Sequence, residues 1–104
     1  MGYLGVVGQT VEPDTAELYD LPAETGAVIS DLDPDGPAID AGLQQGDIVV
    51  AIDGTEITSM ADLAGRIQQH TPGDEVELEL FREDEVLTIT VTLTERPEGQ
   101  SPIG

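Results

Sequence analysis

The sequence has 104 residues, the size of one ordinary domain, and only 3% of them are aromatic, so the core must come from Val, Ile, Leu and Ala. It holds 22 Asp and Glu against 3 Arg, and the formal net charge of -19 repels nucleic acid and anionic lipid, which excludes polynucleotide binding. Because there is no Cys, there is no disulfide, thiol nucleophile or thiolate metal site.

The first part of the chain predicts a strand, a short helix and a second strand. Residues 3–10 read as a strand that two glycines interrupt. Pro13 starts a short helix, with Asp14 as its cap, and the helix is predicted to end near residues 21–22. Residues 27–32 then alternate as a strand does.

The middle of the chain predicts a turn, a one-turn helix and a buried strand. Residues 33–36 must turn the chain, and Pro37 suits the first position of a helix that Gly42 ends in a left-handed conformation. Residues 48–52 are nearly all apolar, as in a strand buried on both faces. An Asp-Gly pair then favours a tight turn into a short strand around residues 56–57.

A longer amphipathic helix is predicted over residues 59–69. Ser59 and Asp62 fit a capping box, and residues 71–74 stop the helix. Apolar side chains recur at the i, i+3, i+4, i+7 spacing that places them on one face. These are Met60, Leu63, Ala64 and Ile67.

Two alternating strands follow, the first with glutamates and the second with threonines on its polar face. A turn at Asp84 and Glu85 would set their register so that apolar residues face each other and no two carboxylates collide. The predicted pairs are Leu80 with Ile89, Leu78 with Val91, and Glu79 with Thr90. From Glu95 the chain has no period, which predicts a linker or frayed end.

These elements predict an α+β fold. Five or six short strands form a partly open antiparallel barrel or sandwich, capped by one long and one or two short helices. No apolar run approaches the roughly 18 residues of a membrane span, and the first residues lack the pattern of a signal peptide. We therefore expect no direct membrane contact from this segment.

Two stretches carry a family resemblance: Tyr3-Leu4-Gly5-Val6 and residues 37–48, Pro-Ala-Ile-Asp-Ala-Gly-Leu-Gln-Gln-Gly-Asp-Ile. Together they resemble the PDZ domains that follow the protease domain in the HtrA/Deg serine protease family. The resemblance implies a PDZ fold of the permuted, bacterial type over residues 1–96, with residues 97–104 as a flexible tail or linker.

In that family a peptide C-terminus adds a strand to a sheet edge beside a helix. The resemblance implies that backbone N–H groups of Leu4, Gly5 and Val6 hold the terminal carboxylate, with Leu4, Val6, Leu63 and Ile67 around the last ligand side chain. Met60 would help to select the ligand residue two before the C-terminus. Because the Met60 side chain is apolar, we expect that ligand residue to be apolar too. The full set of implied peptide-binding residues is Tyr3, Leu4, Gly5, Val6, Val7, Gly8, Met60, Leu63, Ala64 and Ile67.

The implied function is a substrate-recognition and regulatory module of an HtrA-like serine protease in protein quality control. It would capture C-termini or extended segments of unfolded proteins, and its partners include the protease domain of its own parent. The parent is expected to be extracytoplasmic or membrane-anchored, while the fragment's own compartment stays open. Two alternatives remain: a PDZ domain of an intramembrane metalloprotease, and a structural or oligomerisation domain with an unused groove.

The residues predict no catalysis, cofactor or metal site in this chain. Ser30, Ser59 and Ser101 lie in no nucleophile elbow, and the single imidazole, His70, is expected to be a lone surface residue that complements a helix end. Asp31, Asp33, Asp35 and Gly36 match part of a calcium loop, but its twelfth position is Gly42 instead of Glu, so a solvated acidic turn is favoured.

The distribution of charge predicts adaptation to high salt. Acidic residues occur in every segment, which indicates a halophilic source and a fold that salt stabilises by screening repulsion. Many relatives carry a basic residue near the carboxylate-binding loop, whereas here none precedes Arg66. We therefore expect weak peptide binding that salt promotes.

Overall fold

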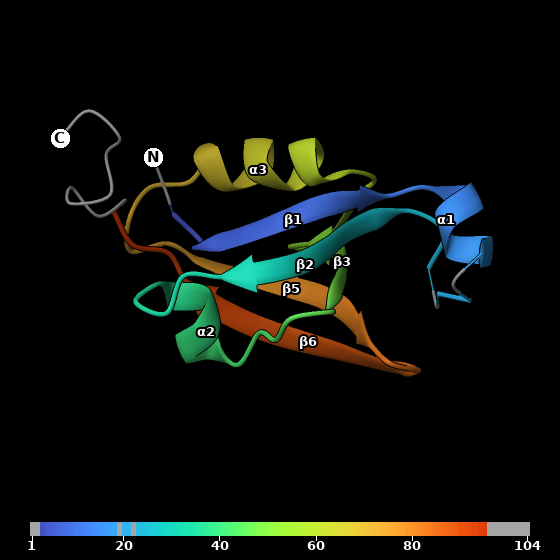
Figure 1. The fold of residues 1–104 in the computed structure, drawn as a ribbon. Helices are drawn as coiled ribbons and strands as arrows, with labels where there is room; N and C mark the ends of the chain where they lie inside the picture. Colours follow the sequence, from blue (N-terminus) through green and yellow to red (C-terminus); the bar gives the residue numbers. More distant parts are fainter. Residues whose placement is uncertain (1–2, 19, 22, 96–104) are drawn as a thin grey trace, which may run out of the picture.

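A computed structural model describes residues 3–18, 20, 21 and 23–95 of the chain. It is built from six strands and three helices in these residues (Figure 1). The strands are β1 (Val6–Val11), β2 (Gly26–Leu32), β3 (Ile48–Ile52), β4 (Thr55–Glu56), β5 (Glu75–Arg82) and β6 (Glu85–Thr92). The helices are α1 (Pro13–Leu18), α2 (Pro37–Ala41) and α3 (Met60–Gln68).

The strands form one antiparallel sheet in the order β1-β2-β3-β5-β6, with β4 paired to β3. A bridge between Tyr3 and Thr94 links the chain just before β1 to the chain just after β6, so the sheet is partly closed. Helix α3 runs beside β1, α2 lies against β6, and α1 sits at the far end of the sheet (Figure 1). The predicted α+β architecture is confirmed.

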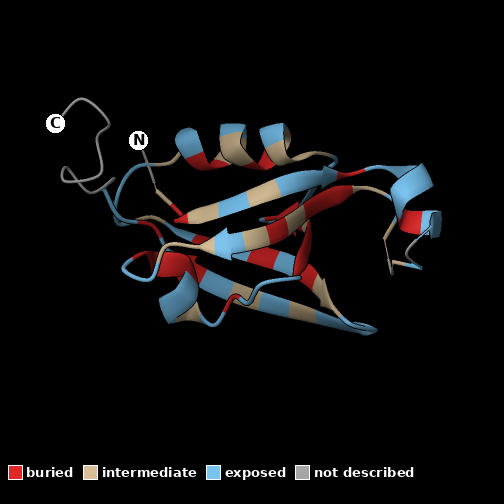
Figure 2. Cartoon of the chain, in the orientation of Figure 1, coloured by how far each residue is buried: buried red, intermediate tan, exposed pale blue. Residues whose placement is uncertain are grey.

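The core is aliphatic, as the composition requires. Figure 2 shows buried and exposed residues alternating along β5, and buried residues on the side of α3 that faces the sheet. The fully buried large side chains come from β2, β3, β5, β6, α3 and the segments beside them, and they are Ile29, Ile57, Leu63, Leu78, Leu80, Leu93, Val49, Val76 and Val91. A smaller cluster around Val11, Ala16 and Ile48 fixes α1 to the sheet.

The start of the chain differs from the sequence prediction in two ways. The first strand begins at Val6 instead of Tyr3, because Gly5 has a φ of +83° and breaks the extended conformation. Helix α1 begins with Pro13 at its first position and ends at Leu18. The sequence predicts a longer helix that ends near residues 21–22. Asp14 therefore lies in the first turn and is not the cap.

The β5–β6 register was predicted wrongly by two residues. Glu83 and Asp84 form the turn, so Leu80 pairs with Leu87 and Leu78 pairs with Ile89. A shift of two keeps every side chain on the same face, since the side-chain period of a strand is two. Glu79 still faces a threonine, Thr88, and no carboxylates meet across the strands at this point.

The helix caps follow the sequence closely. Ser59 Oγ accepts a hydrogen bond from the Asp62 N–H at 2.9 Å, which confirms the α3 cap. The Asp62 carboxylate, however, accepts from the Thr58 N–H at 3.2 Å instead of from Ser59, so the capping box reaches one residue further back. In α2, Pro37 and a left-handed Gly42 with φ +102° stand where they were predicted.

After α3, the carboxylate of Asp74 closes the turn that leads into β5. Its Oδ2 accepts a hydrogen bond from the Thr71 N–H at 3.0 Å. This bond holds the pKa of Asp74 below its ordinary value. The turn thereby sets the direction in which the chain leaves α3.

Candidate peptide-binding site

The loop before β1 has all its carbonyl oxygens engaged. The oxygens of Tyr3, Leu4 and Gly5 each accept a hydrogen bond from a backbone N–H elsewhere in the fold. The donors are Thr94 at 3.3 Å, Ala38 at 3.0 Å and Asp33 at 2.9 Å. In the described ranges, no protein group accepts a hydrogen bond from the Leu4 or Gly5 N–H. Two adjacent amide donors in buried residues are therefore left without a protein acceptor, as in a loop that binds an anion.

The fold holds this loop rigidly. A Cβ on Gly5 would lie 3.2 Å from Gly36 Cα, so only glycine fits this close approach and its positive φ. The Tyr3 hydroxyl donates to Asp33 Oδ2 at 2.7 Å, and Asp33 Oδ1 accepts from the Asp35 N–H at 3.0 Å. The acidic turn of residues 33–36 thus buttresses the loop. Among the described residues, no cluster of three or more His, Cys, Asp or Glu is placed to hold a metal ion.

Strand β1 is one edge of the sheet. It pairs with β2 on one side, and no other strand in the described part of the chain pairs with its outer side. A register shift between Val7 and Gly8 marks a bulge, and the Val7 side chain is 62% exposed. The Val6 side chain is half-buried against the core. An extended segment can add to such an edge through its backbone.

The α3 face points largely into the core. Leu63 and Ile67 are buried with Leu4, whereas Met60 and Ala64 are half-buried. The structure thus brings the predicted residues of loop, strand and helix together along one edge of the sheet, where α3 runs beside β1. It places Leu63 and Ile67 in the core, so their contact with a ligand side chain stays a prediction.

Strand β1 and helix α3 come into contact where α3 begins. A Cβ on Gly8 would lie 2.8 Å from Met60 Sδ, so the thioether rests directly on Gly8. The Met60 N–H also donates to Thr10 Oγ1 at 3.0 Å, which fixes the first turn of α3 to β1. At this point Met60 packs against β1.

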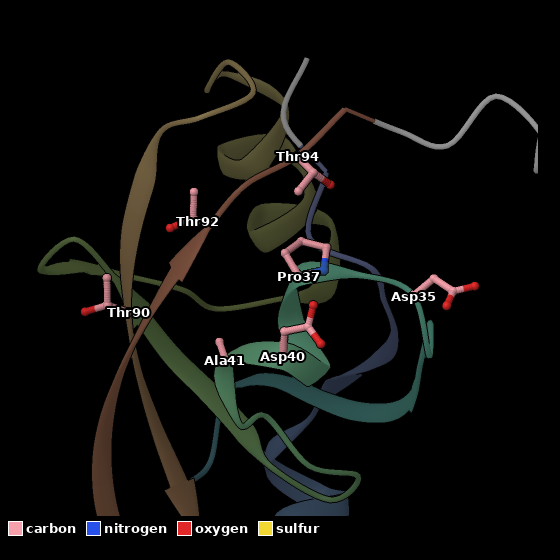
Figure 3. Close-up of a pocket in the computed structure, with 7 residues that line it drawn as sticks. All are labelled: Asp35, Pro37, Asp40, Ala41, Thr90, Thr92 and Thr94. Atoms are coloured by element: carbon pink, nitrogen blue, oxygen red, sulfur yellow. The ribbon is translucent and has the colours of Figure 1, made fainter.

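Two surface hollows flank the fold. One, of about 300 Å³, lies over the loop and the start of β1, and is lined by Tyr3, Gly5, Val6, Val7, Asp31, Leu32, Asp33 and Pro34. The other, of about 340 Å³, lies between α2 and β6 and is shown in Figure 3. It is lined by Asp35, Pro37, Asp40, Ala41, Thr90, Thr92 and Thr94. From the sequence, the three threonines were predicted only to form the polar face of a strand.

The described serines and the histidine have structural partners. Ser30 Oγ donates to the Val7 carbonyl at 3.1 Å, and Ser59 caps α3. His70 Nδ1 lies 2.8 Å from the Arg66 carbonyl, and its Nε2 lies 3.5 Å from Asp53 Oδ2. His70 lies at the end of α3, as expected, but it is not a lone residue because it also contacts the β3–β4 turn. Ser101 lies outside the described residues.

An ion pair holds the segment between α2 and β3. Arg82 Nε and Nη2 donate to the two carboxylate oxygens of buried Asp47 at 2.9 and 2.8 Å. Arg82 Nη2 also donates to the Gly42 carbonyl at 2.9 Å. The hydrogen bonds that Arg82 donates to Asp47 raise the pKa of the Arg82 guanidinium. Since α2 donates to the Leu4 carbonyl, this pair indirectly supports the loop.

Residues 2–93 match the PDZ domain family, and the chain belongs to that family. It is 40% identical over 103 residues to a probable periplasmic serine endoprotease, DegP-like, of Halomonas elongata, a match that covers 99% of this chain and 22% of that protein. It is 38% identical over 96 residues to a protein of the same description from Chlamydia trachomatis. The chain spans about a fifth of the length of these relatives.

Solved structures agree with the fold. The HtrA-type protease AlgW with a decapeptide superposes with a TM-score of 0.81 and 28% identity, covering 92% of this chain and 30% of that one. The HtrA3 PDZ domain bound to a phage-derived ligand, FGRWV, superposes with a TM-score of 0.74 and 23% identity, covering 89% of this chain and 85% of that one. The resemblance to HtrA-type PDZ domains is therefore confirmed.

Proposed function

We propose that this domain binds peptide C-termini or extended protein segments by strand addition to the outer edge of β1. The observation that carries the proposal is the pair of available N–H groups at Leu4 and Gly5, in a loop whose carbonyls are all engaged. These donors stand where the backbone of an added strand would end, so they suit a terminal carboxylate.

The same proposal covers the biological role. The domain, over residues 1–96, acts as the substrate-recognition and regulatory part of a DegP-like serine endopeptidase and works with that parent's protease domain in protein quality control. Curated relatives described as probable periplasmic endoproteases support this role and an extracytoplasmic site of action. The tail assigned to residues 97–104 lies outside the described residues.

Measurements of peptide affinity test whether the Leu4 and Gly5 N–H groups, here called the carboxylate cradle, bind a terminal carboxylate. A fluorescein-labelled peptide with an apolar C-terminal residue is titrated in molar KCl, once as the free acid and once as the C-terminal amide. We expect the amide to bind at least about tenfold more weakly, because it offers the two donors no anion. Equal affinity of the two peptides would refute the cradle.

A matched pair of glycine variants locates the cradle. Gly5→Ala and Gly73→Ala place an alanine at similar positive φ angles, +83° and +96°, but only Gly5 lies in the loop. We expect Gly5→Ala to abolish binding and Gly73→Ala to retain it. Gly73→Ala should lose stability only through its positive φ, whereas Gly5→Ala should lose more because its Cβ also crowds Gly36 Cα. Retained binding by a folded Gly5→Ala variant would contradict the proposal.

A further inference from the structure

The outer side of β6 is the second free edge of the sheet. Just after this strand, the Leu93 N–H donates to the Asp74 carbonyl at 2.8 Å, and the Leu93 carbonyl accepts from the Gly73 N–H at 2.8 Å. Successive residues of a strand direct their N–H and C=O groups to opposite sides, so the even-numbered residues of β6 direct theirs away from β5. Within the described ranges no protein group pairs with the backbone of these residues, which are Val86, Thr88, Thr90 and Thr92.

The sequence of β6 does nothing to protect this edge. Natural sheets guard a free edge with charged side chains, proline, a bulge or a very short strand. Strand β6 has eight residues, and its pairing with β5 has no register shift. Residues 86–94 contain neither a charged residue nor a proline, in a chain that has 22 Asp and Glu. Such an edge is a template for one more strand.

The hollow between β6 and α2 lies at one end of this edge (Figure 3). Threonines of β6 line it on one side, and Pro37 and Ala41 of α2 line it on the other. Asp35 and Asp40 also line it, and both are exposed and have no ion-pair partner among the described residues. A Lys or Arg side chain can lay its hydrocarbon stem on such a surface while its cationic end meets the carboxylates.

Charge decides which partner fits this edge. A two-fold dimer through β6 would pair the strands antiparallel, and it would carry the acidic turn of one copy, residues 83–85, toward Asp35 and Asp40 of the other. Each copy also has a formal net charge of -19, so a second copy is repelled. A basic segment instead meets opposite charge at both ends of the same edge.

We propose that the outer edge of β6 binds an extended basic segment of another protein by strand addition, with a basic side chain of that segment beside Asp35 and Asp40. This site lies at the other edge of the sheet from β1 and requires no free C-terminus, so the domain can hold two segments at once. Salt affects the two sites in opposite directions. It screens the attraction of a basic segment to β6, whereas at β1 it screens the repulsion of a terminal carboxylate.

Two peptides that differ only in charge test this site. Fluorescein-labelled Arg-Thr-Val-Thr-Val-Arg and Glu-Thr-Val-Thr-Val-Glu, both as C-terminal amides, are titrated into the folded domain in dilute buffer. An unlabelled hexapeptide that ends in Gly-Ala-Val with a free carboxylate, the Gly-Ala-Val peptide, is present in excess to occupy β1. We expect the arginine peptide to bind at least about tenfold more tightly than the glutamate peptide and to lose most of that advantage in molar KCl.

Variants of the edge and of the hollow locate the bound segment. Thr90→Pro removes an outward N–H without breaking a hydrogen bond to β5, and Thr90→Ala is its control because it keeps that N–H. We expect Thr90→Pro to weaken binding of the arginine peptide by at least about tenfold, and Thr90→Ala by less than about threefold. The double variant Asp35→Asn, Asp40→Asn should reduce the preference for arginine over glutamate by about threefold or more.

The opposite results are as clear. Equal affinity of the two folded Thr90 variants, or of the two peptides, would overturn the proposal. If Thr90→Pro does not fold, amide chemical shifts of the wild type decide, because changes at Thr88, Thr90 and Thr92 support the site and changes confined to β1 refute it. A dimer in light scattering that Thr90→Pro dissociates would also refute it and assign the edge to a second copy. Failure of the Gly-Ala-Val peptide to bind counts against the proposed function alone.

Discussion

At the scale of single residues, buried Asp47 holds several groups in place through its hydrogen bonds, above all with Arg82. Asp47 is 1% exposed and accepts from both Arg82 and the Gln44 N–H, which lies 2.9 Å from its Oδ2. Removal of one partner leaves the other charge buried and uncompensated, which is more costly than the pair itself is stabilising.

We predict that Arg82→Met lowers the free energy of unfolding by about 3 kcal/mol, because it leaves Asp47 unpaired. Arg66→Met is the matched control, since Arg66 and Asp62 are 3.8 Å apart and both only half-buried, and it should cost less than about 1 kcal/mol. Urea unfolding followed by circular dichroism measures both. Similar losses for the two variants would show that the Asp47 pair has no special role.

The pH dependence of this pair follows from the raised pKa of Arg82. A base with a raised pKa contributes stability that is fully present below its unfolded pKa and is lost as pH rises through the folded one. The difference between Arg82→Met and the wild type should therefore persist throughout the neutral range.

At the scale of elements, the β5–β6 hairpin shows what the sequence could predict. Its two strands were predicted from alternation alone, but alternation is unchanged by a shift of two residues. The turn decides the register, and Glu83 occupies its first central position with a φ of +57°. Glutamate does not favour a positive φ, so nothing in the sequence indicated that Glu83 lies in the turn. The turn was therefore predicted one residue too late, at Asp84 and Glu85.

The binding site was predictable to a similar extent. The glycine pattern around Gly5 and Gly42 identified the loop and the end of α2, because each position requires a backbone that other residues resist. The contact of Met60 with Gly8 and the burial of Leu63 could not be predicted. They depend on how closely α3 approaches β1, and sequence spacing contains no information about that distance.

The strained turn leads to a prediction for the hairpin. A positive φ at the first central residue alone suits a type II′ turn, where glycine is preferred. Glu83→Gly should therefore raise the melting temperature, with a gain of up to about 1 kcal/mol. Asp84→Gly is the control and should lower it, since Asp84 has no positive φ to relieve. A loss of stability in Glu83→Gly would contradict this description of the turn.

At the scale of the whole molecule, repulsion dominates the electrostatics. The formal net charge is -19, and the arginine ion pairs among the described residues are those of Arg66 with Asp62 and Arg82 with Asp47. Salt screens exposed charges over about 10 Å at 0.1 M and about 3 Å at 1 M, and it affects the buried Asp47 pair least. Added salt therefore removes far more repulsion than attraction.

We predict that the melting temperature rises by several degrees between dilute buffer and molar KCl, because salt screens the repulsion between carboxylates. A variant with Glu75, Glu77 and Glu79 changed to Gln carries less repulsion on the β5 surface and should gain less from the same salt. Thermal unfolding followed by circular dichroism checks both proteins. A flat or falling melting temperature in the wild type would contradict salt adaptation.

The most direct test of strand addition is a map of amide chemical shifts during titration with the Gly-Ala-Val peptide in molar KCl. We predict that the largest changes occur at Leu4 and Gly5 and continue along β1, because their N–H groups gain an acceptor and the strand gains a neighbour. Changes centred on the opposite edge, at Thr90 and Thr92 beside the second hollow, with β1 unaffected, would contradict the account.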